Sequence, residues 1–194
     1  ALGRWHMASE DMSPVPLAAG ESSRVDLTFY PVLSELGDEV SGDVLNVIPP
    51  QRAGDIARQS GLATANGRWC PVDFLTFEST QAPGIHVIGD AIQTAPLMPK
   101  SAHMANQHAK VCAAAVLDLL SGAAPQRQPM LTNTCYSFVS DTDVIHVASV
   151  HAYDEAQATF LAVRGSGGLS AEPSDLEGRY ALSWAANIWA DTLG

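Results

Sequence analysis

The chain has 194 residues, of which 46% are hydrophobic and 16% are charged, as expected for a globular protein with a substantial core. Its formal net charge of −11 and the lack of any basic run argue against nucleic-acid binding, because phosphate contacts need clustered Lys and Arg. The acidic surface fits either a basic protein partner or a simple gain in solubility. No run of 18 apolar residues is present, so no membrane span is expected, and the N-terminal segment does not have the pattern of a signal peptide.

The first part of the chain alternates between irregular segments and short extended runs. Residues 1–20 have little periodicity, whereas residues 24–29 alternate in the manner of a strand, and residues 35–40 predict a turn that leads into a second strand. Residues 42–50, GDVLNVIPP, form a continuous apolar run that two prolines end, which is typical of a strand buried on both faces. Residues 51–61 predict a short helix.

The middle of the chain predicts an extended region followed by a long helix. Residues 69–79 are expected to be extended, and residues 84–90, GIHVIGD, to form a strand. Small and apolar residues then recur at helical spacing from Ser101, which can cap the helix N-terminus. Gly122 stands where a C-terminal cap belongs, and Pro125 stops the helix.

The last third predicts strands followed by a helix, which is an α+β pattern. Residues 135–140, 143–153 and 158–165 are expected to form an antiparallel meander. Residues 174–193 predict a terminal amphipathic helix. The residues expected along its apolar side are Leu182, Ala185, Ile188 and Trp189.

The Gly-Asp pair at the end of the predicted strand 84–90 is a candidate ligand site, because α/β sheets bind ligands beyond the carboxyl ends of their strands. Gly89 would let a ligand approach the backbone, and Asp90 can accept a hydrogen bond from a sugar or ribityl hydroxyl. The helix that begins near Ser101 offers unpaired N–H groups and a partial positive charge, to which Lys100 would add. The alternative is that Asp90 only caps a turn and that the helix only packs.

Several motifs, in the same order along the chain, give it a specific resemblance. These are NVIPPQRAG (46–54), WCPVDFLTFES (69–79), GIHVIGDA (84–91), MPKSAHMANQHAK (98–110), NTCYSF (133–138) and YALSWAANIWADTLG (180–194). The stretch around Gly89 and Asp90 resembles the second flavin-contacting segment of the glutathione-reductase-like flavoproteins. More narrowly, the chain resembles the flavoprotein subunit of flavocytochrome c sulfide dehydrogenase from about Trp5 to Gly194.

The resemblance implies a division of the chain into α/β and α+β parts. Residues 1–45 would be the remnant of an NAD(P)-binding-like middle domain, and residues 46–126 the C-terminal part of a Rossmann-like FAD-binding domain. Residues 127–194 would form the C-terminal domain, with an antiparallel sheet and a terminal helix. The GxGxxG fingerprint of these flavoproteins is not found in the sequence, so the chain is expected to be the C-terminal half of a longer protein.

The resemblance also implies a reaction, in which sulfide is oxidised through a redox disulfide beside FAD and electrons pass to a cytochrome c subunit. Cys135 matches the C-terminal member of that disulfide, and the alternative is a structural thiol. The other cysteine and the covalent attachment site of FAD would lie outside this chain, so the fragment alone is expected to be inactive. Cys70 and Cys112 are interpreted as structural, no metal site is predicted, and the family implies a periplasmic location.

The resemblance assigns the flavin contacts to a few positions. Asp90 would bind the ribityl chain, beside Gly89, and the loop and helix start at Met98, Pro99, Lys100 and Ser101 would face the pyrimidine edge. Pro49 and Gln51 are weaker candidates. Trp189 would approach the ring from the terminal helix or would simply pack, and His103 and His108 are interpreted as surface or packing residues.

Two other classes of function stay open. One is a quinone-reducing relative, which shares the flavin fold and the disulfide. A membrane-docking C-terminus would favour it, but the terminal helix carries Asp175, Glu177 and Asp191 and has no basic face. The other is a non-catalytic protein whose C-terminal domain serves only as an interaction surface.

Overall fold

The structure is a computed structural model, which describes residues 5–7, 32–34, 39–40 and 51–194. The chain separates into two compact units, residues 1–51 and residues 52–194. In the first unit, β1 (Trp5–Met7), β2 (Val32–Ser34) and β3 (Glu39–Val40) form an antiparallel sheet in that order. The strands predicted at 24–29 and 42–50 lie outside the described residues.

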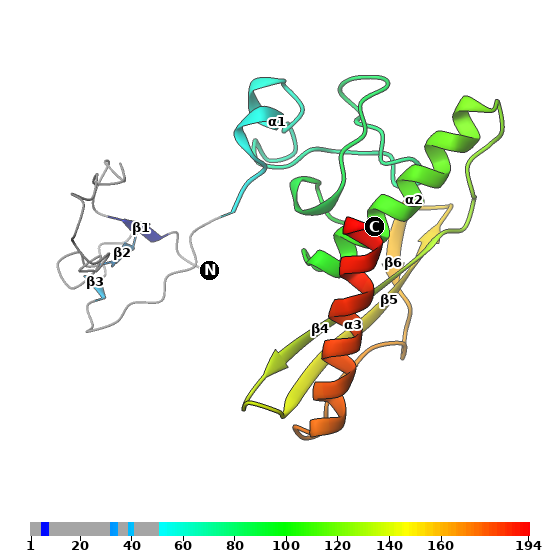
Figure 1. Cartoon of the computed structure of the whole chain (residues 1–194). Helices are drawn as coiled ribbons and strands as arrows, with labels where there is room; N and C mark the ends of the chain where they lie inside the picture. The colour runs from blue at the N-terminus through cyan, green and yellow to red at the C-terminus, as the bar shows by residue number, and fades with distance from the viewer. Residues whose placement is uncertain (1–4, 8–31, 35–38, 41–50) are drawn as a thin grey trace, which may run out of the picture. The chain divides into compact units, whose positions relative to one another are not determined.

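The second unit is built on an antiparallel sheet from the last third of the chain (Figure 1). Its strands are β4 (Met130–Phe138), β5 (Val144–Asp154), β6 (Thr159–Ala162) and β7 (Gly168–Leu169). β5 is central, because it pairs with β4 along one edge and with β6 and β7 along the other. The predicted meander is therefore confirmed, with β7 as a fourth strand.

The register of β4 and β5 gives the sheet two different faces. Leu131 lies opposite His151, Asn133 opposite Ser149, and Cys135 opposite Val147. Because side chains alternate along a strand, these three pairs share one face, while Tyr136 and its partner His146 lie on the other.

The terminal helix, α3 (Asp175–Leu193), packs on the second face of the sheet, as Figure 1 shows. Ser174 caps it by accepting a hydrogen bond from the Glu177 N–H, and the Tyr136 and Trp184 rings meet edge to face at 5.9 Å. The fold predicted for the C-terminal domain, an antiparallel sheet with a terminal helix, is therefore confirmed.

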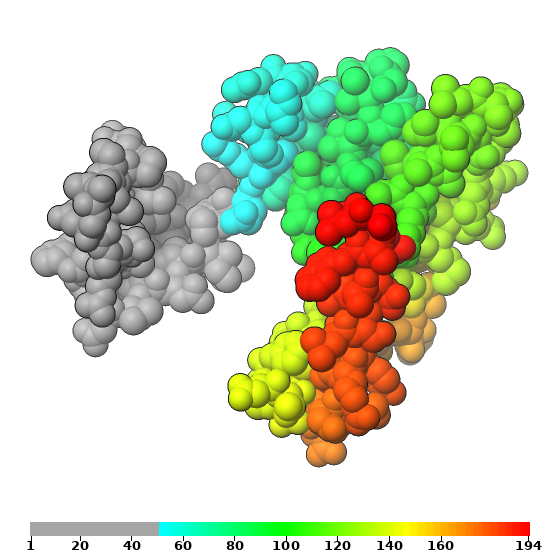
Figure 2. Space-filling view, in the orientation of Figure 1, coloured from blue at the N-terminus to red at the C-terminus, as the bar shows by residue number. Residues whose placement is uncertain are grey.

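The predicted apolar side of α3 is wrong in part. Leu182 and Trp189 are each 66% exposed, and α3 lies on the surface in Figure 2, whereas the fully buried residues are Gly178 and Ala181. Gly178 abuts the backbone carbonyl of Thr142, where no side chain fits. Small residues therefore set the buried side of this helix, and a count of large apolar residues points to the wrong side.

The long helix α2 (Ala102–Leu120) is formed as predicted. Ser101 has an extended backbone, and its hydroxyl accepts a hydrogen bond from the Met104 N–H at 3.0 Å. Gly122, just past the end, has φ 76°, the left-handed conformation that glycine adopts most easily.

The segment before α2 contains little regular structure. It holds α1 (Asp55–Gln59) and the 3-10 turn η2 (Gly89–Ala91). The strand predicted at 84–90 is wrong, because the segment makes only one isolated bridge, between Glu78 and His86. A strand needs a continuous ladder of backbone partners, and the described residues supply none here. Among the described residues, the one parallel backbone pairing is the isolated bridge between Cys70 and Ile92, where a parallel sheet was expected.

The main core joins this irregular segment, α2 and the first face of the sheet. Its most buried large residues are Phe77, Ile92, Met104, Leu131 and Phe160. A smaller cluster holds Ala53, Ala57 and Cys70. The loop that precedes α2 is thus fixed against the sheet face that bears Cys135.

Candidate functional site

The sequence predicted a strand that begins at Cys135. In the structure Cys135 instead lies in the middle of β4. Its side chain is half-buried, and its sulfur contacts the side chain of Asn133, two residues earlier on the same face. The distance from Asn133 Nδ2 to Cys135 Sγ is 3.5 Å. Asn133 itself is only 3% exposed, so its amide is held by protein groups and not by bulk water.

Asn133 also connects this strand to the start of α2. The Ser101 hydroxyl donates to Asn133 Oδ1 at 2.5 Å, while it accepts the N–H of Met104 as the helix cap. The cysteine sulfur and the N-terminus of α2 are therefore joined through one buried amide. Sequence reasoning missed Asn133, although its position two residues before Cys135 places both side chains on one face of a strand.

The N-terminus of α2 has free donors. The backbone N–H groups of Ala102 and His103 have no acceptor among the described residues, because an α-helix leaves its first amides unpaired and the Ser101 hydroxyl takes only that of Met104. Such groups favour negative charge or a carbonyl oxygen. The start of α2 can thus accept an electron-rich ring edge.

The Gly-Asp turn lies beside α2. Gly89 has φ 69°, and a Cβ atom at this position would lie 3.3 Å from Ala105 Cβ, so glycine here allows close contact between turn and helix. Asp90 is exposed, and its carboxylate accepts no hydrogen bond from the described residues. Asp90 is therefore available to a ligand hydroxyl.

The side chains of the loop between η2 and α2 bond to or pack against other parts of the protein. Lys100 Nζ donates to the carbonyl oxygens of Asp90 (2.6 Å) and Ile92 (2.7 Å) and lies 3.7 Å from the centroid of the Trp69 ring. Partial burial lowers the pKa of Lys100, and Asp90 opposes that shift. Met98 is 6% exposed and belongs to the core, and Pro99 is half-buried, so a flavin contact from this loop would come mainly from its backbone.

The remaining predicted flavin contacts are Pro49, Gln51 and Trp189, and they stay predictions. Pro49 lies outside the described residues, and Gln51 is exposed and belongs to the other unit. Trp189 is exposed on α3, which covers the sheet face opposite to Cys135.

His103 and His108 are both packing residues with defined partners. His103 Nδ1 accepts N–H groups from the Thr134 backbone (3.0 Å) and from the Trp184 indole (3.4 Å), so the imidazole is neutral, and burial lowers its pKa. His108 is 1% exposed, and its Nδ1 accepts the Gly89 N–H at 3.2 Å. Burial, with a contribution from the Lys100 charge, lowers the pKa of His108 to about 4.

The three cysteines are all free thiols. Cys70 is fully buried and packs with Ala53 and Ala57, while Cys112 packs against the main core. Burial raises the pKa of both thiols, which makes them poor nucleophiles near neutral pH.

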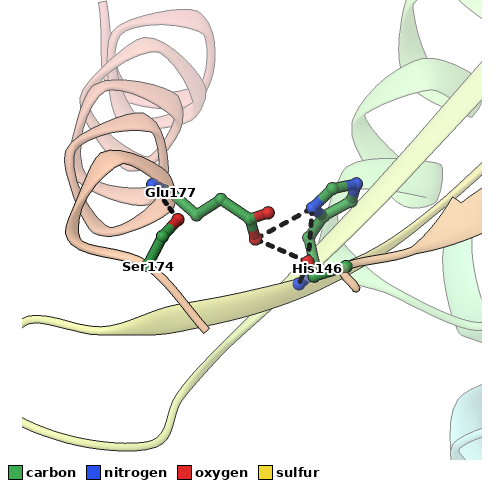
Figure 3. A network of polar contacts seen from close by, with 4 residues as sticks. His146, Ser174 and Glu177 are labelled. Atoms are coloured by element: carbon green, nitrogen blue, oxygen red, sulfur yellow. Dashed lines mark hydrogen bonds and ion pairs between the residues drawn. The ribbon is translucent and has the colours of Figure 1, made fainter. Parts of the chain in front are cut away.

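A polar network on the other face of the sheet fixes the start of α3 (Figure 3). Glu177 Oε2 accepts hydrogen bonds from Ser170 Oγ (2.6 Å) and from His146 Nδ1 (3.0 Å), and Ser170 Oγ lies 2.9 Å from the same His146 nitrogen. These contacts, the Ser170 bond first, lower the pKa of Glu177. The serine and the carboxylate share one ring nitrogen, so the arrangement is no Ser-His-Glu triad, which requires the two different nitrogens.

Other site types find little support in the described part of the chain. A shallow open depression of about 410 Å³ is lined by Asp55, Arg58, Gln59, Ala63 and Gly67, none of which belongs to the Cys135 cluster. The described residues contain no group of three His, Cys, Asp or Glu side chains that could hold a metal ion. No helix among them has the length and apolar character to cross a bilayer.

The chain matches one family model over its C-terminal domain. The model is described as flavocytochrome c sulphide dehydrogenase, flavin-binding, and the match covers residues 127–193. It includes all four strands of the sheet, Asn133, Cys135 and the whole of α3. The match supports FAD as the cofactor. Residues 127–193 are thus similar to the flavin-binding domain of flavocytochrome c sulphide dehydrogenase.

Proposed function

We propose that this chain is the C-terminal part of an FAD-dependent sulfide dehydrogenase, in which Cys135 is one half of a redox disulfide next to the flavin. The match over residues 127–193 is the observation that carries the proposal, since it spans Cys135. The structure supports it by joining Cys135 through Asn133 to Ser101 at the start of α2.

The described residues fit a flavin in three respects. The unpaired N–H groups of Ala102 and His103 would donate to the pyrimidine edge, and Asp90 would accept from the ribityl chain. Lys100 would act indirectly, because its bonds to the Asp90 and Ile92 carbonyl oxygens hold the turn in place. Residues 46–126 would accordingly complete an FAD-binding domain.

The proposed chemistry is thiol–disulfide exchange at Cys135. Sulfide attacks the disulfide, a new sulfur–sulfur bond forms to one cysteine as a persulfide, and the other cysteine leaves as a thiolate. The cysteine that pairs with Cys135 is proposed to lie outside this sequence, because Cys70 and Cys112 are packed in the two apolar clusters. FAD, when bound, supplies the redox centre that takes up the electrons.

The proposed electron acceptor is a cytochrome c subunit in the periplasm. The net charge of −11 fits a partner with a basic docking surface, since opposite charges speed association. The alternatives are a quinone as acceptor, or a domain that only mediates an interaction.

The proposal is tested on the natural protein that contains this chain. It should show flavin absorbance, and sulfide should drive reduction of cytochrome c in preference to a soluble quinone analogue. Preferential reduction of the quinone would show that the protein belongs to the quinone-reducing class. If the protein contained no flavin, only the hypothesis of a non-catalytic interaction domain would stand.

The flavin contact of Asp90 gives a second test. Asp90→Ala should weaken flavin retention or shift its reduction potential, because a hydrogen bond to a charged group contributes roughly 1.5–3 kcal/mol. Asp118→Ala, which removes the same charge from the far end of α2, is the matched control and should change neither property. If both variants hold and reduce flavin like the parent, Asp90 is no flavin ligand.

A further inference from the structure

Cys135 has a defined polar neighbour on the sheet face that it occupies. In the described part of the chain, the polar contacts of its sulfur are all with the Asn133 amide, at 3.5 Å from Nδ2 and 3.8 Å from Oδ1. None of these contacts involves a cationic side chain. The group best placed to favour a negatively charged sulfur is therefore the N–H donor of Asn133.

The orientation of the Asn133 amide is set by Ser101. The Ser101 oxygen accepts the Met104 N–H at 3.0 Å, and its hydroxyl hydrogen is directed at Asn133. The Ser101 hydroxyl donates to Asn133 Oδ1, so the amide oxygen faces Ser101. The amide nitrogen is then left for Cys135, because the amide is planar and its two polar atoms point in different directions.

Burial makes this orientation matter. Asn133 is 3% exposed, so water cannot replace Ser101 as the donor to its oxygen. The Ser101 hydroxyl favours the orientation in which the amide oxygen faces Ser101 and the amide nitrogen faces Cys135. Without this hydroxyl, the amide can rotate so that its oxygen faces the sulfur. An oxygen at that place repels a thiolate, whereas an N–H group stabilises it.

We propose that Asn133 is a positioning residue, which Ser101 orients so that its amide donates to the Cys135 sulfur and stabilises the thiolate form. This inference rests on the proposed function for its purpose: when sulfide attacks the partner sulfur of the disulfide, Cys135 leaves as a thiolate, and the Asn133 N–H would stabilise that leaving group. The N-cap of α2 thus acts on the reactivity of a cysteine in β4, 34 residues further along the chain.

The two helix-capping serines allow a matched test on the 194-residue chain. Ser101 and Ser174 have nearly the same backbone angles, and each accepts the N–H of the residue three positions later. Ser101→Ala and Ser174→Ala therefore each remove one helix cap, but only Ser101 touches Asn133. The measured quantity is the rate at which iodoacetamide alkylates Cys135 at about pH 7 and at about pH 10.5. Mass spectrometry of the peptide that contains Cys135 monitors the reaction.

We expect Ser101→Ala to slow alkylation of Cys135 at about pH 7 by about three- to tenfold. The rate at about pH 10.5 should stay within about twofold of the parent, because every accessible thiol is then ionised. Ser174→Ala should leave both rates unchanged, and Ser101→Thr, which keeps a hydroxyl, should restore the parent rate. If Ser101 only caps the helix, its loss loosens the site, and Cys135 reacts faster or at the same rate at both pH values, which would overturn the proposal.

A second variant covers the case in which Ser101→Ala unfolds the chain. Asn133→Asp keeps an acceptor for Ser101 and replaces the N–H donor with a carboxylate oxygen. It should slow alkylation of Cys135 at about pH 7 by about tenfold or more, and by much less at high pH. A rate equal to or above that of the parent at about pH 7 contradicts the role of the amide. Neither alkylation experiment needs FAD or sulfide. A negative result in these experiments is therefore distinct from a failure of the proposed function.

Discussion

The backbone N–H of Gly89 donates to His108 Nδ1 at 3.2 Å, which ties the Gly-Asp turn to the middle of α2. The His108 ring packs on Phe77 with 4.7 Å between ring centroids, and its pKa lies near 4 because of burial. Acceptance of the Gly89 N–H requires an unprotonated Nδ1, so the contact belongs to the neutral form of the imidazole.

The free energy of unfolding should therefore decrease as the pH is lowered, because His108 takes up a proton when the protein unfolds. The folded pKa of about 4 is below the unfolded value of 6.5, so the unfolded state binds more protons between these values. The stability that neutral His108 confers is complete above about pH 6.5 and is lost progressively toward pH 4, by about 2 kcal/mol at pH 5.

Urea unfolding at about pH 7.5 and pH 5 measures this loss. His108→Leu should be less stable than the parent at the higher pH, because the Gly89 N–H loses its acceptor, and should show a smaller loss between the two pH values. An equal loss in parent and variant would assign the pH dependence to other groups, such as His103 and His151, whose pKa values burial also lowers.

The glycine at position 89 is expected to be needed for a local reason. Gly89→Ala should lower the free energy of unfolding by about 2–3 kcal/mol, because alanine is strained at φ 69° and its Cβ would crowd Ala105. Gly61→Ala is the matched control, since Gly61 has φ 73° and open space around it. It should cost only about 1 kcal/mol. Equal costs would show that the turn and α2 are not in close contact.

Lys100 is expected to stabilise the fold before any ligand binds. Lys100→Met removes two hydrogen bonds to backbone carbonyls and a cation–π contact, so it should lower the free energy of unfolding by about 1–3 kcal/mol. Lys110→Met breaks an exposed ion pair with Asp191 and should lower the free energy of unfolding less than Lys100→Met does. A larger effect at Lys110 would reverse this ranking of the two lysines.

The Glu177 network predicts a stability change at lower pH. The folded pKa of Glu177 is below its unfolded value of 4.5, so its contribution is present above about pH 4.5 and is lost as pH falls through the folded pKa. Glu177→Gln should reduce the stability lost on acidification below about pH 4.5, and Asp175→Asn, in the same helical turn, should have a smaller effect. Thermal unfolding followed by far-UV circular dichroism at about pH 7 and pH 3.5 provides the measurement.

Regular elements of the second unit could be predicted from the sequence where local signals are strong. Ser101 and Gly122 marked the two ends of α2, and alternation marked the strands of the meander. The short helix predicted at 51–61 is present as α1, and α3 begins one residue after the start predicted at residue 174. These signals depend on a few neighbouring residues, and tertiary packing did not override them.

Features that depend on distant partners could not be predicted in the same way. Residues 84–90 have the composition of a strand, but a strand forms only where a neighbour supplies a backbone ladder. The buried side of α3 is set by the fit of Gly178 against Thr142, which no count of apolar residues detects. The contact between Ser101 and Asn133 joins residues 32 positions apart and appears only in three dimensions.

The redox role of Cys135 is the central claim, and sulfide-dependent cytochrome c reduction by the natural protein tests it most directly. Cys135→Ser should retain the fold and bound FAD but lose this activity, because no sulfur remains at position 135 to exchange with sulfide. Cys112→Ser, which alters a thiol of the α2 core, should keep most of the activity. Near-normal turnover in Cys135→Ser, with FAD bound, would contradict the account and leave Cys135 as a packing residue.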